Sequence, residues 1–513
     1  VADGFFRSLS GSGLNPFTTS FNFTTLTNTD PNGRALNSGG NPLRKLYSQF
    51  GKVDYAYNDK YLISATLRRD GSSVFGENDK YGIFPAISGG WRISQEDFLR
   101  SVNWITELKI RGGWGVMGNE RPVGSANRFN TIGGGPGSTG YDLNGTQTSI
   151  VPGIRITGVG DPTVKWEENT TTNIGFDGTF FKSRLEVILD VYKRKTNDLL
   201  FNQSLPATLG DVGAPFVNIG SMENKGVDVL VTYKGRASRA FRYEADVIFT
   251  TYDNKITKIS EITDKFDVGF SNRIGGGVVR NVVGQPVSTF YGYKVIGLFK
   301  DTMEVAGAPK QTGAGPGRFR YEDVSGPKGI PDGIIDDKDR TYIGNPNPAF
   351  TYGFNTRLYY KNFDFEALFY GVAGANVLNF SRWFTDFYPS FAGIGKSTRV
   401  LNAWTPTNTN TTIPRFENVS NLSTNGELNS YYVENSSYFR LRSLKIGYNL
   451  SSNLLQKAGL DKLHFFVQGT NLFTITKYTG TDPAVSGADT NFGVDVGNYP
   501  TNKQLLFGFN IGL

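Results

Sequence analysis

The amino-acid sequence predicts an all-β fold, namely a transmembrane antiparallel β-barrel. Three observations support this prediction: polar and apolar residues alternate along many segments, these segments are long, and the connections between them are alternately short and long. The composition agrees, since aromatic residues make up 14% of the 513 residues and 63 residues are Gly. Aromatic side chains favour strands and membrane-interface girdles, whereas glycine favours turns.

The alternation has a period of two residues, which is the period of a β-strand. The segment 183–192 places four aliphatic side chains on one face and Glu186 and Asp190 on the other. The segment 502–513 likewise places Leu and Phe side chains opposite Gln504 and polar or glycine neighbours. Such segments are about 10–13 residues long, which fits a tilted membrane crossing better than a soluble sandwich, whose strands are nearer 5–6 residues.

The pattern predicts 14 strands, near residues 17–26, 44–57, 60–69, 82–93, 105–115, 166–181, 183–195, 223–235, 241–254, 349–360, 362–371, 438–450, 460–471 and 502–513. The region 255–348 has room for no further strand or for two, with 288–299 as one candidate, so the total is 14 or 16. With the C-terminus in the periplasm, every long connection falls on the outer side of the membrane, as in outer-membrane barrels.

The composition excludes several functions. No apolar run approaches the ~20 residues of a membrane helix. The chain has no Cys and a single His, His464, so it lacks the residues for a thiol nucleophile, a Cys-ligated zinc or a hydrolase triad, and we predict that it is not an enzyme. The net charge is +7 without a basic cluster among aromatics, which argues against nucleic acid. Gly113, Gly115 and Gly118 spell G-x-G-x-x-G, but no helix follows, so we interpret them as turn glycines.

Several stretches resemble the C-terminal barrel of SusC/RagA-like TonB-dependent transporters. They are residues 60–71 and 81–96 (KYLISATLRRDG and YGIFPAISGGWRISQE), 108–119 (LKIRGGWGVMGN), 284–299 (GQPVSTFYGYKVIGLF), 343–354 (IGNPNPAFTYGF), 438–450 (YFRLRSLKIGYNL) and 468–483 (QGTNLFTITKYTGTDP). They follow the order of the family and span nearly the whole chain. The resemblance implies a barrel of 22 strands, with residues 1–513 as its C-terminal portion and with an N-terminal plug and first strands that this sequence does not contain.

The resemblance also implies a function. A protein of this family would carry out TonB-dependent active import of a sizeable nutrient, an oligosaccharide or a peptide, across the outer membrane of a Gram-negative bacterium. Its partners would be TonB, acting through the N-terminal region, a SusD-like surface lipoprotein over the outer mouth, and the surrounding outer-membrane lipid. The alternatives are a passive porin, a non-transporting structural or adhesin barrel, and a soluble β-rich binding protein, against which the length of the strands argues.

The most polar stretch is a candidate metal site. The family often carries a calcium-loop-like segment at this place, and Asp323, Asp332, Asp336 and Asp339 match carboxylate positions of it. Carboxylates spaced around a glycine turn can converge on a hard cation. An insertion at 326–331 separates the two halves of the segment, so a solvated acidic loop is the alternative, and no cofactor other than calcium is implied.

A long connection carries a group of aromatic residues, Trp383, Phe384, Phe387 and Tyr388. These side chains are candidates for contacts with the substrate or with the lid protein, because aromatic rings stack on sugars and bury well at interfaces. The alternative is a small core of the loop itself. Packing is favoured, because several aromatic rings in one long loop have to be buried against something.

Overall fold

The computed structural model describes residues 7–12, 35–40, 44–134, 139–142, 145, 150–202, 205, 207–260, 263–269, 273–274, 279–326, 328–390, 393–451, 455 and 460–512. Its main element is a 13-stranded antiparallel sheet, which we call the wall. In their order across the sheet, the strands are β3 (Leu46–Tyr57), β4 (Tyr61–Ser72), β5 (Tyr81–Arg92), β6 (Ile105–Asn119), β11 (Glu167–Phe180), β12 (Leu185–Asn197), β15 (Ser221–Arg236), β16 (Phe241–Lys258), β25 (Phe350–Tyr360), β26 (Phe363–Ala373), β29 (Tyr438–Asn449), β30 (Lys462–Thr476) and β32 (Gln504–Gly512).

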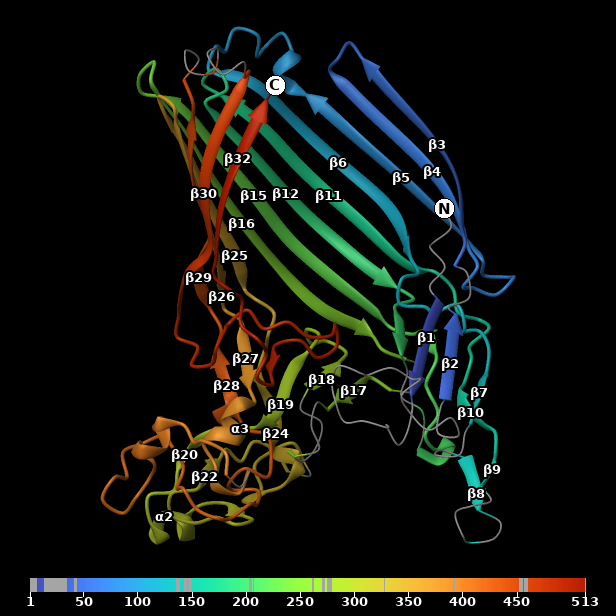
Figure 1. Ribbon diagram of the computed structural model, residues 1–513, viewed down its shortest axis with the longest axis vertical. Helices are drawn as coiled ribbons and strands as arrows, with labels where there is room; N and C mark the ends of the chain where they lie inside the picture. Colours follow the sequence, from blue (N-terminus) through green and yellow to red (C-terminus); the bar gives the residue numbers. More distant parts are fainter. Residues whose placement is uncertain are drawn as a thin grey trace, which may run out of the picture.

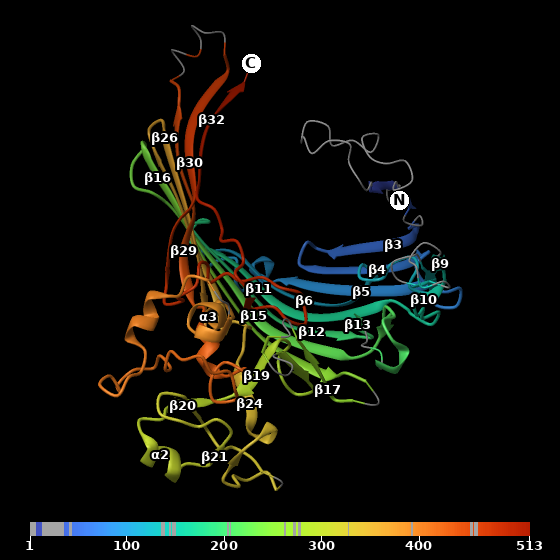
Figure 2. The same cartoon turned by 60° about the horizontal axis from the view of Figure 1, so that its bottom comes forward.

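The wall is curved, with its strands strongly tilted (Figures 1 and 2). Each strand pairs with the wall strand that precedes it and the one that follows it in the chain, and β3 and β32 lie at the two edges. This up-and-down order is the topology of an outer-membrane barrel. Within the described residues, no helix combines the length and the hydropathy that a membrane crossing needs.

The strand register confirms the period-2 prediction. It aligns Ile174 with Val191, and Val191 with Val227, so that apolar side chains form rows on one face of the wall. These side chains are exposed, with Ile174 65% and Val191 51% accessible. The opposite face, which we call the polar face, carries Arg, Asp and Glu side chains. A sheet that exposes its apolar face is arranged for a lipid environment rather than for water.

The structure contains 13 of the 14 predicted wall strands, and the remaining one, 17–26, lies outside the described residues. The region 255–348 adds no strand to the wall, because β16 pairs directly with β25. The candidate crossing 288–299 was therefore wrong. It forms β19 (Thr289–Tyr293) and β20 (Val295–Leu298) instead, two short strands outside the wall.

The tight connections lie at one end of the wall. Asn58 and Asp59 join β3 to β4 with φ values of 51° and 57°, and Lys361 joins β25 to β26 with φ of 51°. Positive φ at the central residues is the geometry of the primed hairpin turns, whose twist matches that of the flanking strands. The long connections leave from the opposite end (Figure 1).

The long connections fold into small sheets. A four-stranded sheet contains β17 (Lys265–Val268), β18 (Val279–Val282), β19 and β24 (Arg340–Gly344), and a three-stranded sheet contains β28 (Val433–Asn435), β27 (Asn376–Asn379) and β31 (Val494–Asp495). The paired short strands are β1 (Arg7–Ser12) with β2 (Ala35–Gly40), β7 (Thr131–Gly133) with β10 (Arg155–Gly158), β8 (Gly140–Asp142) with β9 (Ile150–Pro152), β13 (Leu200–Asn202) with β14 (Phe216–Asn218), β20 with β22 (Phe319–Tyr321), and β21 (Lys310–Gln311) with β23 (Ile334–Ile335). The helices are α2 (Thr302–Gly307), α3 (Ser381–Thr385) and the 3-10 turns Ile93–Gln95, Ala207–Leu209, Asp337–Asp339, Tyr388–Ser390, Thr398–Asn402 and Ser430–Tyr432.

The described parts of 263–348, 374–437 and 477–500 pack together beyond the ends of the wall strands (Figure 1), and we call them the loop module. Its core consists of buried apolar side chains, namely Ile274, Val279, Phe290, Tyr293, Leu298, Phe319, Tyr321, Ile335, Leu378, Phe380, Trp383, Phe387, Trp404, Leu428, Tyr432 and Val494. These residues come from three connections far apart in the chain. The loop module is thus built like a small soluble domain, with its apolar side chains inside.

Candidate functional site

The polar face of the wall carries ion pairs that bridge neighbouring strands. Arg111 of β6 binds Asp177 of β11 at 3.0 Å and Asp190 of β12 at 2.6 Å, and Lys109 binds Asp177 at 3.1 Å. All four side chains are about one-quarter exposed. Because each carboxylate is already engaged by a cation, this group fastens three strands together and offers no free charge for catalysis.

A second group on the polar face is dominated by carboxylates. Arg357 of β25 contacts Glu244 at 3.0 Å, Asp246 at 3.4 Å and Glu366 at 3.3 Å. One guanidinium therefore serves three carboxylates on the two strands that flank it. Asp246 also accepts hydrogen bonds from Thr232 and Asn355, so it is satisfied in place. The wall near these residues presents net negative charge to the space it encloses.

His464 lies on the polar face, as the alternation of β30 predicts. Its Nε2 lies 2.8 Å from Oδ1 of Asp364 on β26, an atom that also accepts a hydrogen bond from Asn449. The sequence pointed to no partner for this histidine, since 100 residues separate the two side chains. In the described part of the chain, no group of three or more His, Asp or Glu side chains is arranged to hold a metal ion. The pair therefore fastens strands in the same way as Arg111.

The structure shows what the four aspartates of the candidate calcium loop do. Asp339 is fully buried and accepts hydrogen bonds from the backbone N–H groups of Val324, Ser325 and Asp336. Asp336 caps the 3-10 turn by accepting the N–H of Lys338. Both carboxylates thus bind backbone donors, which is the usual role of Asp at the start of a helical turn.

The other two aspartates are engaged in the same way. Asp323 accepts the N–H of Gly333 through Oδ2, and Asp332 accepts the N–H of Ile334. Oδ1 of Asp323 is buried and has no hydrogen-bond partner among the described residues. Bound calcium at Asp323, Asp332, Asp336 and Asp339 stays a prediction.

The four predicted contact aromatics have different surroundings. Trp383 and Phe387 are 6% and 4% exposed and belong to the core of the loop module, and Phe384 packs against that core. The indole N–H of Trp383 donates to the carbonyl of Asn425. Tyr388 alone is exposed, at 52%. Three of the four side chains therefore pack inside the loop module, and Tyr388 retains surface for a partner.

The G-x-G-x-x-G glycines are not turn glycines, and this interpretation was wrong. Gly113, Gly115 and Gly118 all lie inside strand β6. A Cβ at Gly118 would lie 2.2 Å from the ring of Phe84, and one at Gly115 would lie 2.9 Å from the Cβ of Ala86. Close packing against the neighbouring strand β5 thus requires Gly115 and Gly118, whereas a Cβ at Gly113 would lie 2.9 Å from the side-chain oxygen of Asn173 on β11.

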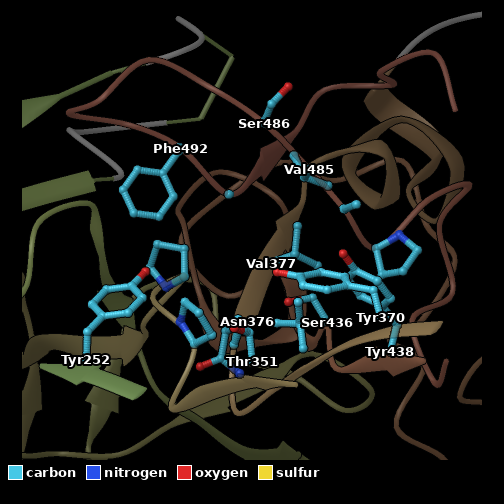
Figure 3. Close-up of a pocket in the computed structure, with 17 residues that line it drawn as sticks. Tyr252, Thr351, Tyr370, Asn376, Val377, Ser436, Tyr438, Val485, Ser486 and Phe492 are labelled. Carbon is cyan, nitrogen blue, oxygen red and sulfur yellow. The ribbon is translucent and has the colours of Figure 1, made fainter. Parts of the chain in front are cut away.

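A cavity of about 510 Å³ lies where the loop module meets the polar face of the wall (Figure 3). Its floor is formed by side chains from four successive strands, Tyr252 of β16, Thr351 of β25, Tyr370 of β26 and Tyr438 of β29. The register places all four on the polar face. Residues 483–486 and Phe492, from the connection before β32, complete the enclosure. In Figure 3, Tyr252 and Phe492 lie on one side and Tyr370 and Tyr438 on the other.

A larger cavity of about 820 Å³ adjoins the first, and Tyr252 and Phe492 line both. Its lining is mostly apolar but includes Glu167, Arg194 and other charged side chains. The sequence pattern predicted neither cavity. One feature of the sequence could have indicated them. Tyr252, Tyr370 and Tyr438 each lie near one end of a strand, at a position that alternation assigns to the polar face, so they predict aromatic rings at the rim of that face.

Comparisons with known proteins agree with this architecture. The family described as TonB dependent receptor-like, beta-barrel matches residues 4–472. The chain is 34% identical over 482 residues to TonB-dependent receptor P3 of Formosa agariphila, which covers 91% of this chain and 45% of that protein. It is 28% identical over 481 residues to TonB-dependent receptor SusC of Bacteroides thetaiotaomicron, covering 91% of this chain and 43% of that protein. The chain thus spans less than half the length of these curated relatives.

A solved structure of the RagAB peptide transporter superimposes on this chain with a TM-score of 0.79 and 24% identity, covering 96% of this chain and 50% of that one. This likeness confirms the barrel fold. The family match confirms the prediction that the chain is not an enzyme. The chain belongs to the TonB-dependent receptor family and forms part of the β-barrel by which such a receptor spans the outer membrane.

Proposed function

We propose that the protein containing this chain carries out TonB-dependent import of a sizeable nutrient, an oligosaccharide or a peptide, across the outer membrane. The observation that carries the proposal is the match of residues 4–472 to the TonB-dependent receptor barrel. The name of the RagAB peptide transporter supports it as well, because that protein has the same fold. The proposal requires that the full-length protein contain a plug and further barrel strands in addition to residues 1–513.

The geometry gives each region a role in import. The apolar face of the wall contacts lipid, and the polar face lines the path of the substrate. The loop module and the two cavities lie at the end opposite the tight turns, which is the outer end in a barrel whose short connections are periplasmic. A nutrient arriving from outside would therefore meet the cavities first. A SusD-like lipoprotein would cover this end, with Tyr388 among the side chains available to it.

Uptake measurements test energised import. A strain lacking the gene for the full-length protein, a strain lacking TonB and the parent strain are compared, using a pool of fluorescently labelled neutral oligosaccharides and a pool of labelled peptides. We expect the parent strain to accumulate components of one pool and both mutants to lose that accumulation. Uptake that persists without TonB would indicate a passive porin. Uptake that persists without the receptor would indicate a structural or adhesin barrel.

A separate experiment tests the lipoprotein partner. The full-length protein is purified from outer membranes in mild detergent through an affinity tag, and every co-purifying polypeptide is identified by mass spectrometry. We expect a surface lipoprotein in an amount similar to that of the receptor. A variant with Tyr388→Ala, in which the exposed ring is removed, is the first to compare for partner recovery. Recovery of the receptor alone would contradict the partner proposal and leave TonB-dependent uptake untouched.

A further inference from the structure

The smaller cavity has a lining that differs from the rest of the polar face. None of the 17 described residues that line it is Asp, Glu, Lys or Arg. Elsewhere on the polar face, ion pairs such as those of Arg111 and Arg357 succeed one another along the strands. The guanidinium carbons of Arg440 and Arg442 lie 5.1 and 5.3 Å from the ring centres of Tyr438 and Tyr370, but neither arginine lines the cavity. A cavity without charges is suited to a neutral ligand, because a buried charge needs a charged or strongly polar partner.

The same lining combines flat apolar surfaces with hydroxyl groups. Tyr252, Tyr370, Tyr438 and Phe492 supply four aromatic rings. Among the described residues, no hydrogen bond engages the hydroxyls of the three tyrosines. These groups are therefore available to a ligand, and each can both donate and accept. Rings and free hydroxyls together match a sugar, which has an apolar C–H face and a rim of hydroxyls.

The lining offers little to a peptide backbone. Each residue of a bound peptide presents an N–H and a C=O group that need partners when they are buried. Pro346, Pro348 and Pro483 form part of the lining and have no N–H to donate. The carbonyl of Gly493 already accepts the N–H of Leu378, and the side-chain oxygen of Asn376 already accepts the N–H of Asn345. The backbone around the cavity is thus largely committed to its own fold.

From these observations we propose that the cavity bounded by Tyr252, Tyr370, Tyr438 and Phe492 is a binding subsite for a neutral oligosaccharide. The proposal rests on the proposed import function and names its substrate class. The volume of about 510 Å³ lies in the range of roughly 300–1,000 Å³ that small-ligand sites occupy. Because Tyr252 and Phe492 also line the larger cavity, a chain of sugars continues from one cavity into the next.

Two substitutions in the enclosing connection test the subsite without altering the wall. Phe492→Ala removes an aromatic surface, and Ser486→Lys adds a cation at an exposed position of an uncharged lining. Thr409→Lys is the matched control, since Thr409 is an exposed loop-module residue outside the cavity. Each full-length variant is purified in detergent, and its heat-dependent electrophoretic mobility and protease resistance are compared with those of the wild type to establish that it is folded.

Binding is measured by calorimetry with maltoheptaose, xylohexaose, mannohexaose and laminarihexaose, and with a panel of end-capped, uncharged hexapeptides. We expect at least one oligosaccharide to bind the wild type. Phe492→Ala should raise its Kd by about tenfold, in the range that the loss of one aromatic contact produces. Ser486→Lys should also raise its Kd, because a neutral ligand offers no partner for the added cation. Thr409→Lys should leave the Kd unchanged.

Three results would overturn the subsite. The first is an oligosaccharide Kd that neither cavity variant changes. The second is that peptides bind, sugars do not, and the cavity variants weaken the binding of the peptides. The third is that no oligosaccharide binds the wild type. Each of these is distinct from a failure of the proposed function, which is measured by uptake in the strains with and without TonB. Energised uptake of peptides together with unaffected cavity variants would leave import standing and remove the sugar site.

Discussion

The wall and the loop module use apolar side chains in opposite ways. In the wall, large apolar residues such as Ile174 and Phe507 are 65% and 70% exposed, and the paired charges lie on the other face. In the loop module, large apolar residues such as Phe319 and Tyr432 are fully buried. The solvent explains the difference. Lipid accepts an apolar surface at no cost, whereas a module in water must bury its own.

The two regions also differ in how far apart their contacting residues lie in the chain. Wall strands pair only with the wall strand before or after them, whereas the core of the loop module unites residues from Ile274 to Val494. The burial of ion pairs in the two regions differs as well. Asp386 of the loop module is 1% exposed and bound by Arg399 at 2.7 Å, while Arg111 of the wall remains one-quarter exposed. The loop module is therefore the region whose stability depends most on single buried side chains.

Removal of one core ring should break the loop module and leave the wall intact. Phe319 is 0% exposed and packs against Tyr321, Phe387 and Tyr431. The change Phe319→Ala should cost about 3–5 kcal/mol of module stability, from lost burial and the cavity left behind. Limited proteolysis of the full-length protein in detergent should then cleave within 263–437, while the heat-dependent electrophoretic mobility of the barrel stays unchanged.

Leu401→Ala is the control for this prediction, because Leu401 is 90% exposed and its loss removes little packing. The control should resist protease as well as the wild type does. If Phe319→Ala abolished the barrel mobility as well, the two regions would fold as one cooperative unit, and the comparison between them would fail.

The wall comparison is tested by placing a charge on each face. Val247 and Ile248 are adjacent on β16, are 48% and 43% exposed, and point to the apolar and polar faces respectively. Val247→Arg should destabilise the barrel by about 2–4 kcal/mol, the cost of an Arg near the middle of a bilayer. Ile248→Arg should cost much less. Reversible urea unfolding of the full-length protein in lipid vesicles measures both, and equal losses would show that the faces are assigned incorrectly.

The sequence predicted the wall because its signal is local. Alternation in β12 or β32 needs only neighbouring residues, and strand length and connection length then set the topology. The loop module gave no such signal. The segment 288–299 alternates enough to resemble a crossing, yet Phe290 and Tyr293 are buried in a core shared with α3 and β31. A core assembled from three distant connections has no period to detect.

Site residues likewise divide into those with a local sequence signal and those without one. The polar-face position of His464 followed from alternation, but its partner Asp364 depends on which strands are neighbours. Tyr252, Tyr370 and Tyr438 are 68 residues or more apart and meet only through the register of four strands. Trp383 was predicted as a contact residue because it belongs to a group of aromatic residues in one connection. The density of that group also indicated a small core.

A substitution in the acidic loop at 323–339 should lower the stability of the loop module by an intermediate amount. The carboxylate of Asp339 accepts three backbone N–H groups, so Asp339→Ala should cost about 1.5–3 kcal/mol of module stability. Because these bonds need no ion, the loss should appear in the presence of EGTA. Protease resistance is measured with EGTA and with excess calcium. The predicted calcium site requires that calcium increase the protease resistance of the wild-type module and leave that of the Asp339→Ala variant unchanged.

The smallest effect concerns the pH dependence of the loop module. Partial burial raises the pKa of Glu427 above its ordinary value of 4.5; the negative charge of Asp337 acts in the same direction, and Arg340 opposes it. The folded module therefore binds a proton at Glu427 more tightly than the unfolded chain does, and stability is lost as the pH rises from 4.5 through the raised pKa. At neutral pH, Glu427→Gln should stabilise the module by about 1 kcal/mol or less, and the gain should vanish below pH 4.5. Protease susceptibility across this pH range measures the change in stability.

Glu417→Gln is the matched control, and we expect it to destabilise the module, because Glu417 forms two hydrogen bonds with Arg318 and its charge supports the fold. A gain in both variants would indicate net negative charge on the module as the cause, rather than the burial of Glu427.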